Sequence, residues 1–552
     1  MSTFIAAVGL LVLLLMPAFG CAGTPSVERN ETAAPEPPRE YVDTALVPAA
    51  GRTIRVHDGD DLQDAIDIAR LGDTIVLDAG ATFKGPFTLP KKTGTGWVTI
   101  TTSTPDKQFP LPGSRVSPSH APLMPKLISW KGEGVVLADR GAHHYRFIGI
   151  EVTPSEGTYL YSVMWFGTNR EPTLEALPHH IIVDRCYIHG DPKKGSRRGV
   201  ALNGRHLAVI DSYVSDFKEV GGDSQAIIGW AGSGPFKINN NYLEGAGENV
   251  MFGGGDPSIT NLVPSDIEVR RNLIVKPLRW KKNEPGFEGT PWMVKNLFEL
   301  KNARRVVVEG NILEHSWEAA QSGFAVLFTV RNQDGRAPWS VVEDVQFVNN
   351  IIRHSGSGVN VLGHDDNHRS QETKRILIRN NLWEDIGGER WGGRGILFQM
   401  LEGTSDVNIE HNTGIQLGYT LLSTGPPHRR FMFRHNIAPH NEYGIYGTDV
   451  GVGVAALDAY FPDAVVTDNV LAGGEARRYP EGNVFPDSID AVPFADRRAG
   501  NYRLTGGIKH LKDPGVDAGA LCAALSPQDA REQPICGVRT AETQQGRAMA
   551  SP

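Results

Sequence analysis

The chain has 552 residues and a formal net charge of −8, and 40% of its residues are hydrophobic. This length is ample for a large core, and the acidic balance argues against a non-specific nucleic-acid binder, which is normally basic. A local basic groove can still lie on an acidic protein, so the composition does not exclude an acidic polymer as ligand.

The first 21 residues have the features of a processing signal. An apolar run from Ile5 to Met16 is too short to span a membrane as a mature helix, and Pro17 breaks it. The small residues before Cys21 are similar to a bacterial lipobox. We therefore predict that Cys21 is lipidated and that the protein is secreted and anchored to the cell envelope, with plain secretion as the alternative. We expect no other contact with a membrane.

Residues 22–50 are polar and rich in proline, which is typical of a disordered tether between an anchor and a folded body. Residues 62–69 then have the apolar spacing of one or two amphipathic helical turns, which Gly72-Asp73 ends. Residues 74–77 and 98–100 are predicted to be strands. We expect the short helix to cover the hydrophobic end of the first coil.

A short pattern recurs from about residue 180: an apolar residue, two polar residues, a residue that is Asn in most copies, and two apolar residues. The copies are 24 to 39 residues apart, as coils of about 20 residues with variable loops would be. We predict one solenoid over residues 51–480. The fourth residues of the ten copies are Cys186, Ser212, Asn241, Asn272, Asn311, Asn350, Asn381, Asn412, Asn436 and Asn469.

The asparagines of this repeat suit a stacked corner. Asn tolerates the left-handed backbone of a tight turn, and its amide can bond to the backbone. Stacked Asn side chains can also bond to one another, as they do in cross-β arrays. The repeat therefore predicts an all-β, single-stranded parallel β-helix with an N-terminal helical cap. The general crossover preference predicts that the β-helix is right-handed.

The stretch LQDAIDIARLGDTIVLDAGATFKGPF (62–87), together with the coil pattern, resembles the pectate-lyase-like parallel β-helix proteins over roughly residues 52–480. The resemblance is at the level of the fold, because lyases, hydrolases, epimerases and phage tailspikes share the coil. It implies a surface that binds polysaccharide. Pectate-lyase-like enzymes commonly use a Lys or Arg base together with Ca²⁺.

Residues 481–552 lack the repeat and are predicted to be a C-terminal cap or tail that covers the last coil, because an open solenoid end risks aggregation. Cys522 and Cys536 could form one disulfide in an oxidising compartment, with two free thiols as the alternative. Cys186 falls within the repeat and is expected in the core. The absence of a CxxC pair argues against a cysteine zinc site.

Several basic residues follow the strands that precede the long loops. Three residues beyond an inward apolar column, Lys301, Arg331 and His364 are predicted to stack outward on successive coils about 4.8 Å apart. Glu299 shares this face with Lys301. The inward column consists of Phe252, Phe298, Phe328, Val361 and Phe398. The substrate-binding residues predicted on or beside this face are His364, Asn360, Asp334 and Gln399.

This row of cations suits a polymer of uronic acids, which carries a carboxylate on each sugar. In a lyase, a base removes the proton next to that carboxylate, and a cation beside the carboxylate makes the proton more acidic. Packed cations also lower the pKa of a neighbouring Lys. We predict that Lys301 or Arg331 is the base or the neutralising cation and that Glu299 orients them. A solvated face or pairing between strands is the alternative.

Two acids and two tryptophans complete the prediction. Asp256 and Glu248 could hold Ca²⁺ through oxygen ligands, with ordinary turn chemistry as the alternative. Trp292 and Trp339 lie in or beside the long insertions 275–296 and 315–340. They could stack on sugar rings, or they could pack their loops onto the coil.

These patterns favour a monomeric, surface-anchored polysaccharide lyase that acts by β-elimination on a polysaccharide and binds no nucleic acid. One rival is a glycoside hydrolase that uses Glu299 with Asp334, because hydrolysis needs two carboxylates about 5–10 Å apart. The other rival is a non-catalytic module that binds polysaccharide or mediates adhesion. No P-loop, HExxH or GxSxG motif occurs in a suitable context.

Overall fold

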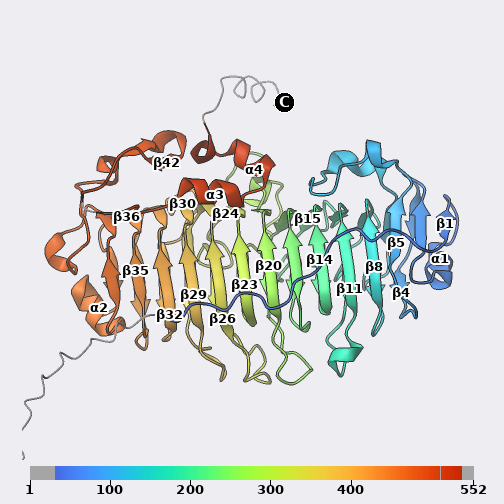
Figure 1. Cartoon of the computed structure of the whole chain (residues 1–552), viewed down its shortest axis with the longest axis horizontal. Helices are drawn as coiled ribbons and strands as arrows, with labels where there is room; N and C mark the ends of the chain where they lie inside the picture. The colour runs from blue at the N-terminus through green and yellow to red at the C-terminus, as the bar shows by residue number, and fades with distance from the viewer. Residues whose placement is uncertain (1–31, 510, 538–552) are drawn as a thin grey trace, which may run out of the picture. The chain divides into compact units, whose positions relative to one another are not determined.

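A computed structural model describes residues 32–509 and 511–537. These residues form three long sheets, and the chain passes from one sheet to the next within each coil (Figure 1). The strand pairings within the three sheets are parallel, except for that of β37 with β38. None of the helices among the described residues is long and apolar enough to cross a membrane. The predicted processing signal, Cys21 and residues 22–31 lie outside the described residues.

The elements are as follows. Sheet A contains, in spatial order, β1 (Thr53–Val56), β2 (Thr74–Leu77), β5 (Val98–Thr102), β8 (His143–Ile148), β11 (His179–Asp184), β14 (Arg205–Ile210), β17 (Phe236–Asn239), β20 (Ser265–Arg270), β23 (Ala303–Glu309), β26 (Val342–Val348), β29 (Lys374–Arg379), β32 (Ser405–Glu410), β35 (Met432–Arg434) and β39 (Val465–Thr467). Sheet B contains β3 (Thr82–Lys84), β6 (Lys126–Ser129), β9 (Glu151–Pro154), β12 (Tyr187–His189), β15 (Tyr213–Phe217), β18 (Tyr242–Gly245), β21 (Leu273–Val275), β24 (Ile312–Ser316), β27 (Ile351–Ser355), β30 (Leu382–Ile386), β33 (Thr413–Gln416), β36 (Ile437–Pro439) and β40 (Val470–Ala472). Sheet C contains β4 (Phe87–Leu89), β7 (Val136–Ala138), β10 (Met164–Phe166), β13 (Arg198–Leu202), β16 (Gln225–Gly229), β19 (Glu248–Phe252), β22 (Phe298–Leu300), β25 (Phe324–Thr329), β28 (Ser357–Leu362), β31 (Phe398–Leu401), β34 (Leu421–Thr424), β37 (Ile445–Gly447) and β38 (Gly451–Val452). The helices are α1 (Leu62–Ile68), α2 (Val454–Tyr460), α3 (Ala518–Ala524) and α4 (Pro527–Glu532), and β41 (Phe494–Asp496) pairs with β42 (Asn501–Leu504).

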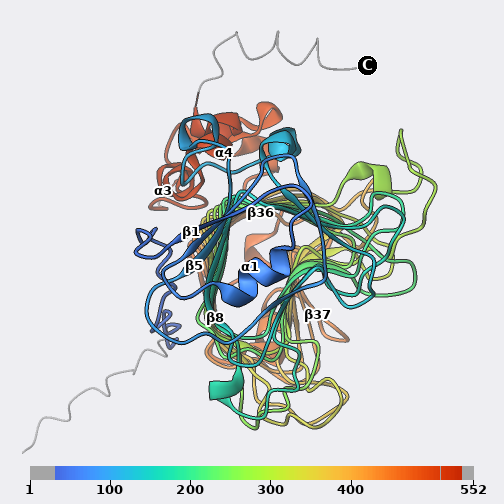
Figure 2. The same ribbon diagram turned by 90° about the vertical axis from the view of Figure 1, so that its right-hand side faces the viewer.

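Helix α1 and the first strands form where the sequence predicts them. The Asp61 side chain caps the helix by accepting hydrogen bonds from the Gln63 and Asp64 backbones. The buried face of the helix, including Leu62 and Ile66, joins the continuous core between the three sheets. Figure 2 shows α1 at the N-terminal end of the sheets. Cys186 also belongs to this core and is a free thiol.

The predicted ladder of asparagines is confirmed. From Asn241 to Asn469, each Nδ2 donates to the Oδ1 of the next ladder residue at 2.9–3.1 Å. The ladder ends one step later than predicted, at Asn483. The left-handed backbone is not at the ladder residue, as predicted, but at the residue before it, such as Asn349 (φ 56°). That residue turns the chain, which leaves the next N–H and amide free to bond along the stack.

Residues 32–45 differ from the expected disordered tether. They lie across the strands of sheet A, as the dark blue segment of Figure 1 shows. The backbone N–H groups of Ala33, Glu36 and Arg39 donate to three carboxylates of sheet A at 2.8–3.0 Å. These acceptors are Asp406 in β32, Asp344 in β26 and Asp266 in β20.

The spacing of these contacts explains why the segment fits. Three residues of extended chain span about 9–10 Å, because each residue advances the chain by about 3.1–3.3 Å. Two strand spacings of a sheet also span about 9.6 Å. Every third N–H therefore meets a carboxylate on every second strand. We call residues 32–45 the strap.

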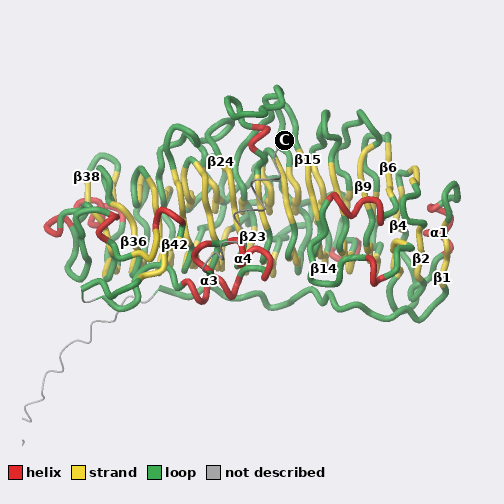
Figure 3. Tube along the Cα trace, turned by 90° about the horizontal axis from the view of Figure 1, so that it is seen from above, coloured by secondary structure: helices red, strands yellow, loops and turns green. Residues whose placement is uncertain are grey.

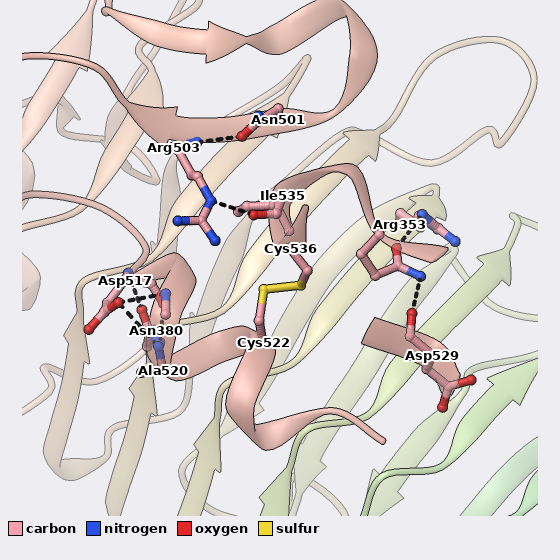
Figure 4. Close-up of a disulfide and its surroundings, with 12 residues drawn as sticks. Arg353, Asn380, Asn501, Arg503, Asp517, Ala520, Cys522, Asp529, Ile535 and Cys536 are labelled. Atoms are coloured by element: carbon pink, nitrogen blue, oxygen red, sulfur yellow. Dashed lines mark hydrogen bonds between the residues drawn. A yellow bond between two sulfur atoms is a disulfide. The ribbon is translucent and has the colours of Figure 1, made fainter. Parts of the chain in front are cut away.

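The C-terminal segment covers the last coil only with its first residues. Asn483 bonds to Asn469, and Val484 forms a parallel bridge with Val470 of β40. Leu521, Leu525 and Ile535 pack on the outer side of sheet B, against residues of β24, β27 and β30. Cys522 and Cys536 are joined by the predicted disulfide, beside which Asn380 and Asp517 bond to each other (Figure 4). Figure 3 shows α3 and α4 alongside the stacked strands. Helix α2 is the element that follows the last strands of sheet C and packs against them.

Candidate functional site

The candidate site lies on the outer face of sheet C, on strands β22, β25, β28 and β31. The register pairs Glu299 with Leu327, Leu327 with Asn360, and Asn360 with Gln399. These side chains form one outward row, and Gln399 Nε2 donates to Asn360 Oδ1 at 3.3 Å. The structure thus brings together three of the residues that the sequence assigned to this face.

The predicted alignment of Phe298 with Phe328 is wrong by two residues, because Phe298 pairs with Val326 and Leu300 pairs with Phe328. Side chains in a strand alternate with a period of two, so a shift of two residues leaves each side chain on the same face. Lys301 and Arg331 remain neighbours on successive coils, because the Arg331 backbone N–H donates to Lys301 O at 2.8 Å.

Lys301 and Arg331 line two adjoining cavities. The first has a volume of about 340 Å³ and the second about 440 Å³. The first is lined by Glu299, Lys301, Gln321, Ser322, Phe324, Leu327, Thr329, Arg331 and Asn360. The second is lined by Lys301, Arg331, Gln333, Asp365, Asn367 and His368. A larger cavity of about 710 Å³ lies between sheet A and residues 513–520, but it is a gap beneath the C-terminal segment and contains none of the candidate site residues.

Glu299 fixes the position of Lys301. The Glu299 side chain is 1% exposed, and its Oε1 lies 3.6 Å from Lys301 Nζ. Thr329 Oγ1 donates to the same oxygen at 3.2 Å, and Asn296 Nδ2 donates to Oε2 at 2.9 Å. The Lys301 side chain remains 14% exposed. The Lys301 ammonium group is thus fixed by the buried Glu299 carboxylate and remains accessible from the cavity.

Arg331 is held by two acids on the next coil. It donates to Asp365 Oδ1 at 2.8 Å and to Asp366. Burial opposes the charge of Arg331, but these two carboxylates outweigh it and raise the pKa of the guanidinium. Burial likewise acts to raise the pKa of Asp365, yet hydrogen bonds from Asn367 and Arg331 bring it below its usual value. Arg331 is therefore a permanent cation.

A buried acid lies next to this site. Glu248 is 0% exposed and accepts a hydrogen bond from Gln225 Nε2 at 2.7 Å, while Lys295 Nζ lies 3.6 Å from its other oxygen. Burial, then the charges of Glu299 and Asp223, raise the pKa of Glu248. Its position below the surface suits a support of the site rather than contact with a ligand.

The structure does not bring the two predicted Ca²⁺ ligands together. Glu248 begins β19, and Asp256 follows the end of that strand. The Asp256 carboxylate instead accepts hydrogen bonds from the Asp334 and Arg336 backbones at 3.1 and 2.8 Å. Among the described residues, no three carboxylates bring oxygens within 4.8 Å of one another. Calcium needs six to eight oxygen ligands, which Glu248 and Asp256 do not supply as a pair, and Ca²⁺ binding stays a prediction.

The other predicted ligand-binding residues have partners within the protein. Exposed His364 bonds through Nδ1 to Glu402 O at 3.1 Å, and Asp334 pairs with Arg336. Trp292 is 8% exposed in a cluster with other tryptophans, and Trp339 Nε1 donates to Leu262 O at 3.0 Å. Both tryptophans thus pack their loops.

Sequence reasoning missed several residues in and beside the cavities. Asn296 and Gln321 come from the long insertions, and Asn296 Nδ2 donates to both Glu299 and Gln321. Asp365, which anchors Arg331, was not among the predicted site residues. A signal existed for Asn296 and Gln321, because both lie within the insertions that flank the basic residues. No pattern in one sequence shows which insertion residues turn back to the strand face.

Comparison with solved structures shows the fold. No protein-family model and no curated protein matches the chain. The PL6 family alginate lyase AlyGC superposes with a TM-score of 0.52 at 14% identity, over 87% of this chain. The chain spans 58% of the length of that protein. A mannuronic acid specific polysaccharide family 6 lyase from human gut microbiota gives a TM-score of 0.48 at 13% identity, over 78% of this chain and 87% of that one. The chain has the parallel β-helix fold of AlyGC.

Proposed function

We propose that the protein is a polysaccharide lyase that cleaves a polymer containing uronic acids by β-elimination. The observation that carries this proposal is the pair Lys301 and Arg331, which share two adjoining cavities on the outer face of sheet C. The alginate lyase that shares the fold makes alginate the first substrate to test. The sequence signal at Cys21 adds that the enzyme acts outside the cell, anchored by a lipid.

The two cations have different roles in this proposal. The raised pKa of Arg331 keeps it charged, so it suits the carboxylate of the sugar. Lys301, in its unprotonated form, takes the proton from the carbon next to that carboxylate. The electron pair of that C–H bond forms the new C=C bond, the glycosidic C–O bond breaks, and the leaving oxygen takes up a proton from water; the protonated Lys301 then returns its proton to the hydroxide that remains. Lys301 thus gains one proton and loses it again, and no oxidant or reductant is needed.

Asn360 and Gln399 extend the row beyond the two cations. Both are half-buried and carry amides that can donate to and accept from sugar hydroxyls. Glu299 is a positioning residue for Lys301, because it is too buried to meet the sugar. No step is assigned to Ca²⁺, since Glu248 and Asp256 lie at opposite ends of β19.

The decisive experiment incubates the protein with a panel of uronate polymers, alginate first, and follows the ultraviolet absorbance of the unsaturated product. The wild type should produce it, and Lys301→Ala should lower the rate by about 10²–10⁴-fold, as expected for loss of a general base. Lys374→Ala is the matched control, because Lys374 also pairs with a glutamate (Glu343, 3.4 Å) but lies on sheet A.

The rivals give different results in the same assay. A glycoside hydrolase releases reducing ends without the absorbance, and a binding module retains polymer without cutting it. Equal rates for wild type and Lys301→Ala would remove Lys301 from the reaction.

A further inference from the structure

Two pairs of adjacent histidines lie side by side in sheet A, far from the residues of the proposed lyase site. His143-His144 begins β8 and His179-His180 begins β11, and His143 is paired with His179 in the register of these strands. Consecutive strand residues normally point to opposite faces. His144 and His180 instead have left-handed backbones, with φ of 58° and 54°. Within each pair the two Nδ1 atoms consequently lie only 2.8 Å apart.

The two pairs are stacked on each other. The ring centroids of His143 and His179 are 4.8 Å apart and those of His144 and His180 are 4.5 Å apart, with 4° between the planes in both cases. Ligating nitrogens of His144, His179 and His180 all lie within 4.8 Å of one another. In the described part of the chain, this is the one place where three such potential ligands converge.

Each pair of rings shares one proton between its two Nδ1 atoms. His143 Nε2 lies 3.0 Å from Lys92 O, and a carbonyl can only accept, so Nε2 carries the proton and Nδ1 accepts the hydrogen bond from His144 Nδ1. A metal ion that displaces this shared proton meets nitrogen lone pairs of both rings. Burial, followed by the charges of neighbouring histidines and Arg205, lowers the pKa of His179 to about 4 and that of His180 to about 3. Both rings are neutral at pH 7, which is the form that binds metals.

Further along sheet A, charged residues occupy the corner that the histidines occupy in β8 and β11. There Asp and Arg alternate, and Arg305 pairs with Asp266, Arg375 with Asp344 and Arg430 with Asp406 at 2.6–2.7 Å. Among the described residues, no carboxylate forms an ion pair with His143, His144, His179 or His180. The four histidines are thus neutral nitrogen ligands. They lack the Asp–Arg ion pairs that occupy the same corner further along sheet A.

We propose that His143, His144, His179 and His180 bind one divalent transition-metal ion such as Zn²⁺. The ion links the coil that contains β8 to the coil that contains β11. Imidazole nitrogens suit Zn²⁺, Cu²⁺ and Ni²⁺, whereas Ca²⁺ and Mg²⁺ require oxygen ligands. Zn–N bonds of about 2.0–2.1 Å place tetrahedral ligands about 3.3 Å apart. The nitrogens of a pair therefore need to separate slightly from 2.8 Å. A metal ion lies close to the plane of each imidazole that binds it, so the stacked rings also need to turn out of their parallel arrangement.

The location assigns this metal a structural role. The four histidines lie on sheet A, whereas Lys301 and Arg331 follow strands β22 and β25 of sheet C. An ion bound to the folded chain stabilises it by mass action, so it adds to the stability of the N-terminal coils. The proposal is independent of the lyase activity.

The test is calorimetric titration of the full chain with Zn²⁺, after chelator treatment and without a polyhistidine tag. The wild type should bind one ion per chain, and its melting temperature should rise with Zn²⁺. The double variant H179Q/H180Q should lose both effects. The matched control is H411Q/H435Q, because His411 and His435 are also stacked, with centroids 4.6 Å apart, but neither has an adjacent histidine. This control should bind Zn²⁺ as the wild type does.

Two results would overturn the proposal: no binding of Zn²⁺ by the wild type, or equal binding by the wild type and H179Q/H180Q. Circular dichroism establishes that each variant is folded. Should the double variant fail to fold, the single variant H180Q replaces it. It should bind Zn²⁺ at least about 10-fold more weakly, and an unchanged affinity would again overturn the site.

Discussion

Lys301 Nζ lies 3.6 Å from Glu299 Oε1, and the carboxylate is itself fixed by Thr329 and Asn296. The ammonium group at the base of the cavity is therefore held by a buried group that has little freedom to move. Holding a reacting group in place lowers the entropy that must be lost in the reaction. The charge and the geometry of Glu299 should thus matter to the rate, although Glu299 does not touch the substrate.

The first prediction concerns Glu299→Gln, which keeps the shape and removes the charge. We expect kcat on uronate polymer to fall by about 10²-fold, the scale of a misplaced reacting group, while KM changes much less. The measurement is initial rate against polymer concentration. Glu343→Gln, which removes the partner of Lys374, should leave both constants unchanged. A Glu299→Gln enzyme with the wild-type kcat would show that Lys301 needs no such support.

The face of the candidate site could be predicted from the sequence, but its register could not. Alternation in a strand fixes whether a side chain points in or out, so Lys301, Arg331 and Glu299 were correctly placed outward. The partner with which a strand residue pairs depends on the length of each loop. The insertion 275–296 makes this partner impossible to read from the sequence. Because Phe298 and Phe328 are both inward phenylalanines, aligning them looked natural, although Phe298 pairs with Val326.

The second prediction concerns the asparagine ladder. Asn350 Oδ1 accepts from both the backbone and the side chain of Asn311. Asn350→Ala leaves these two buried donors without a partner, at a cost of about 1–3 kcal/mol for each. We expect the free energy of unfolding, measured in urea, to fall by an amount of that order. Asn408→Ala, in β32 and outside the ladder, should change the unfolding free energy much less. Equal shifts for the two variants would mean that the ladder adds no stability.

The repeat made the fold predictable, because one requirement recurs in every coil. Each corner must satisfy a buried N–H, and Asn does so while bonding to the next coil, so Asn appears nine times at similar positions, from Asn241 to Asn483. The strap shows the limit of this reasoning. Its sequence is polar and proline-rich, and its order comes from Asp266, Asp344 and Asp406, which are far away in the chain. The handedness of the solenoid stays a prediction.

The third prediction concerns the strap. Hydrogen bonds from a backbone N–H to a charged carboxylate are worth about 1.5–3 kcal/mol, so residues 32–45 should resist exchange. Hydrogen exchange followed by mass spectrometry should show protection of this peptide in the wild type. Asp344→Asn should speed exchange at Glu36, whose N–H it holds at 2.9 Å. Asp334→Asn, in an exposed loop, is the control. Full exchange of the wild-type peptide at the earliest time would instead support a free tether.

The fourth prediction concerns the pH dependence of stability, measured in chelator so that no metal contributes. Burial, then neighbouring positive charges, lower the pKa of His144, of His179 to about 4 and of His180 to about 3, against about 6.5 in an unfolded chain.

As the pH falls from about 6.5 towards 4, the unfolded chain takes up protons at these positions and the folded chain does not. The histidines therefore add their full stability above about pH 6.5 and lose it on acidification. Carboxylates also titrate in the lower part of this pH range. The test therefore compares the wild type with histidine variants that keep the same carboxylates. As the pH decreases, the urea midpoint of the variant H144Q/H179Q/H180Q should fall less steeply than that of the wild type. The urea midpoint of His364→Gln, at an exposed position, should follow the wild type. Parallel curves for the triple variant and the wild type would show that these histidines are protonated as easily in the folded chain as in the unfolded one.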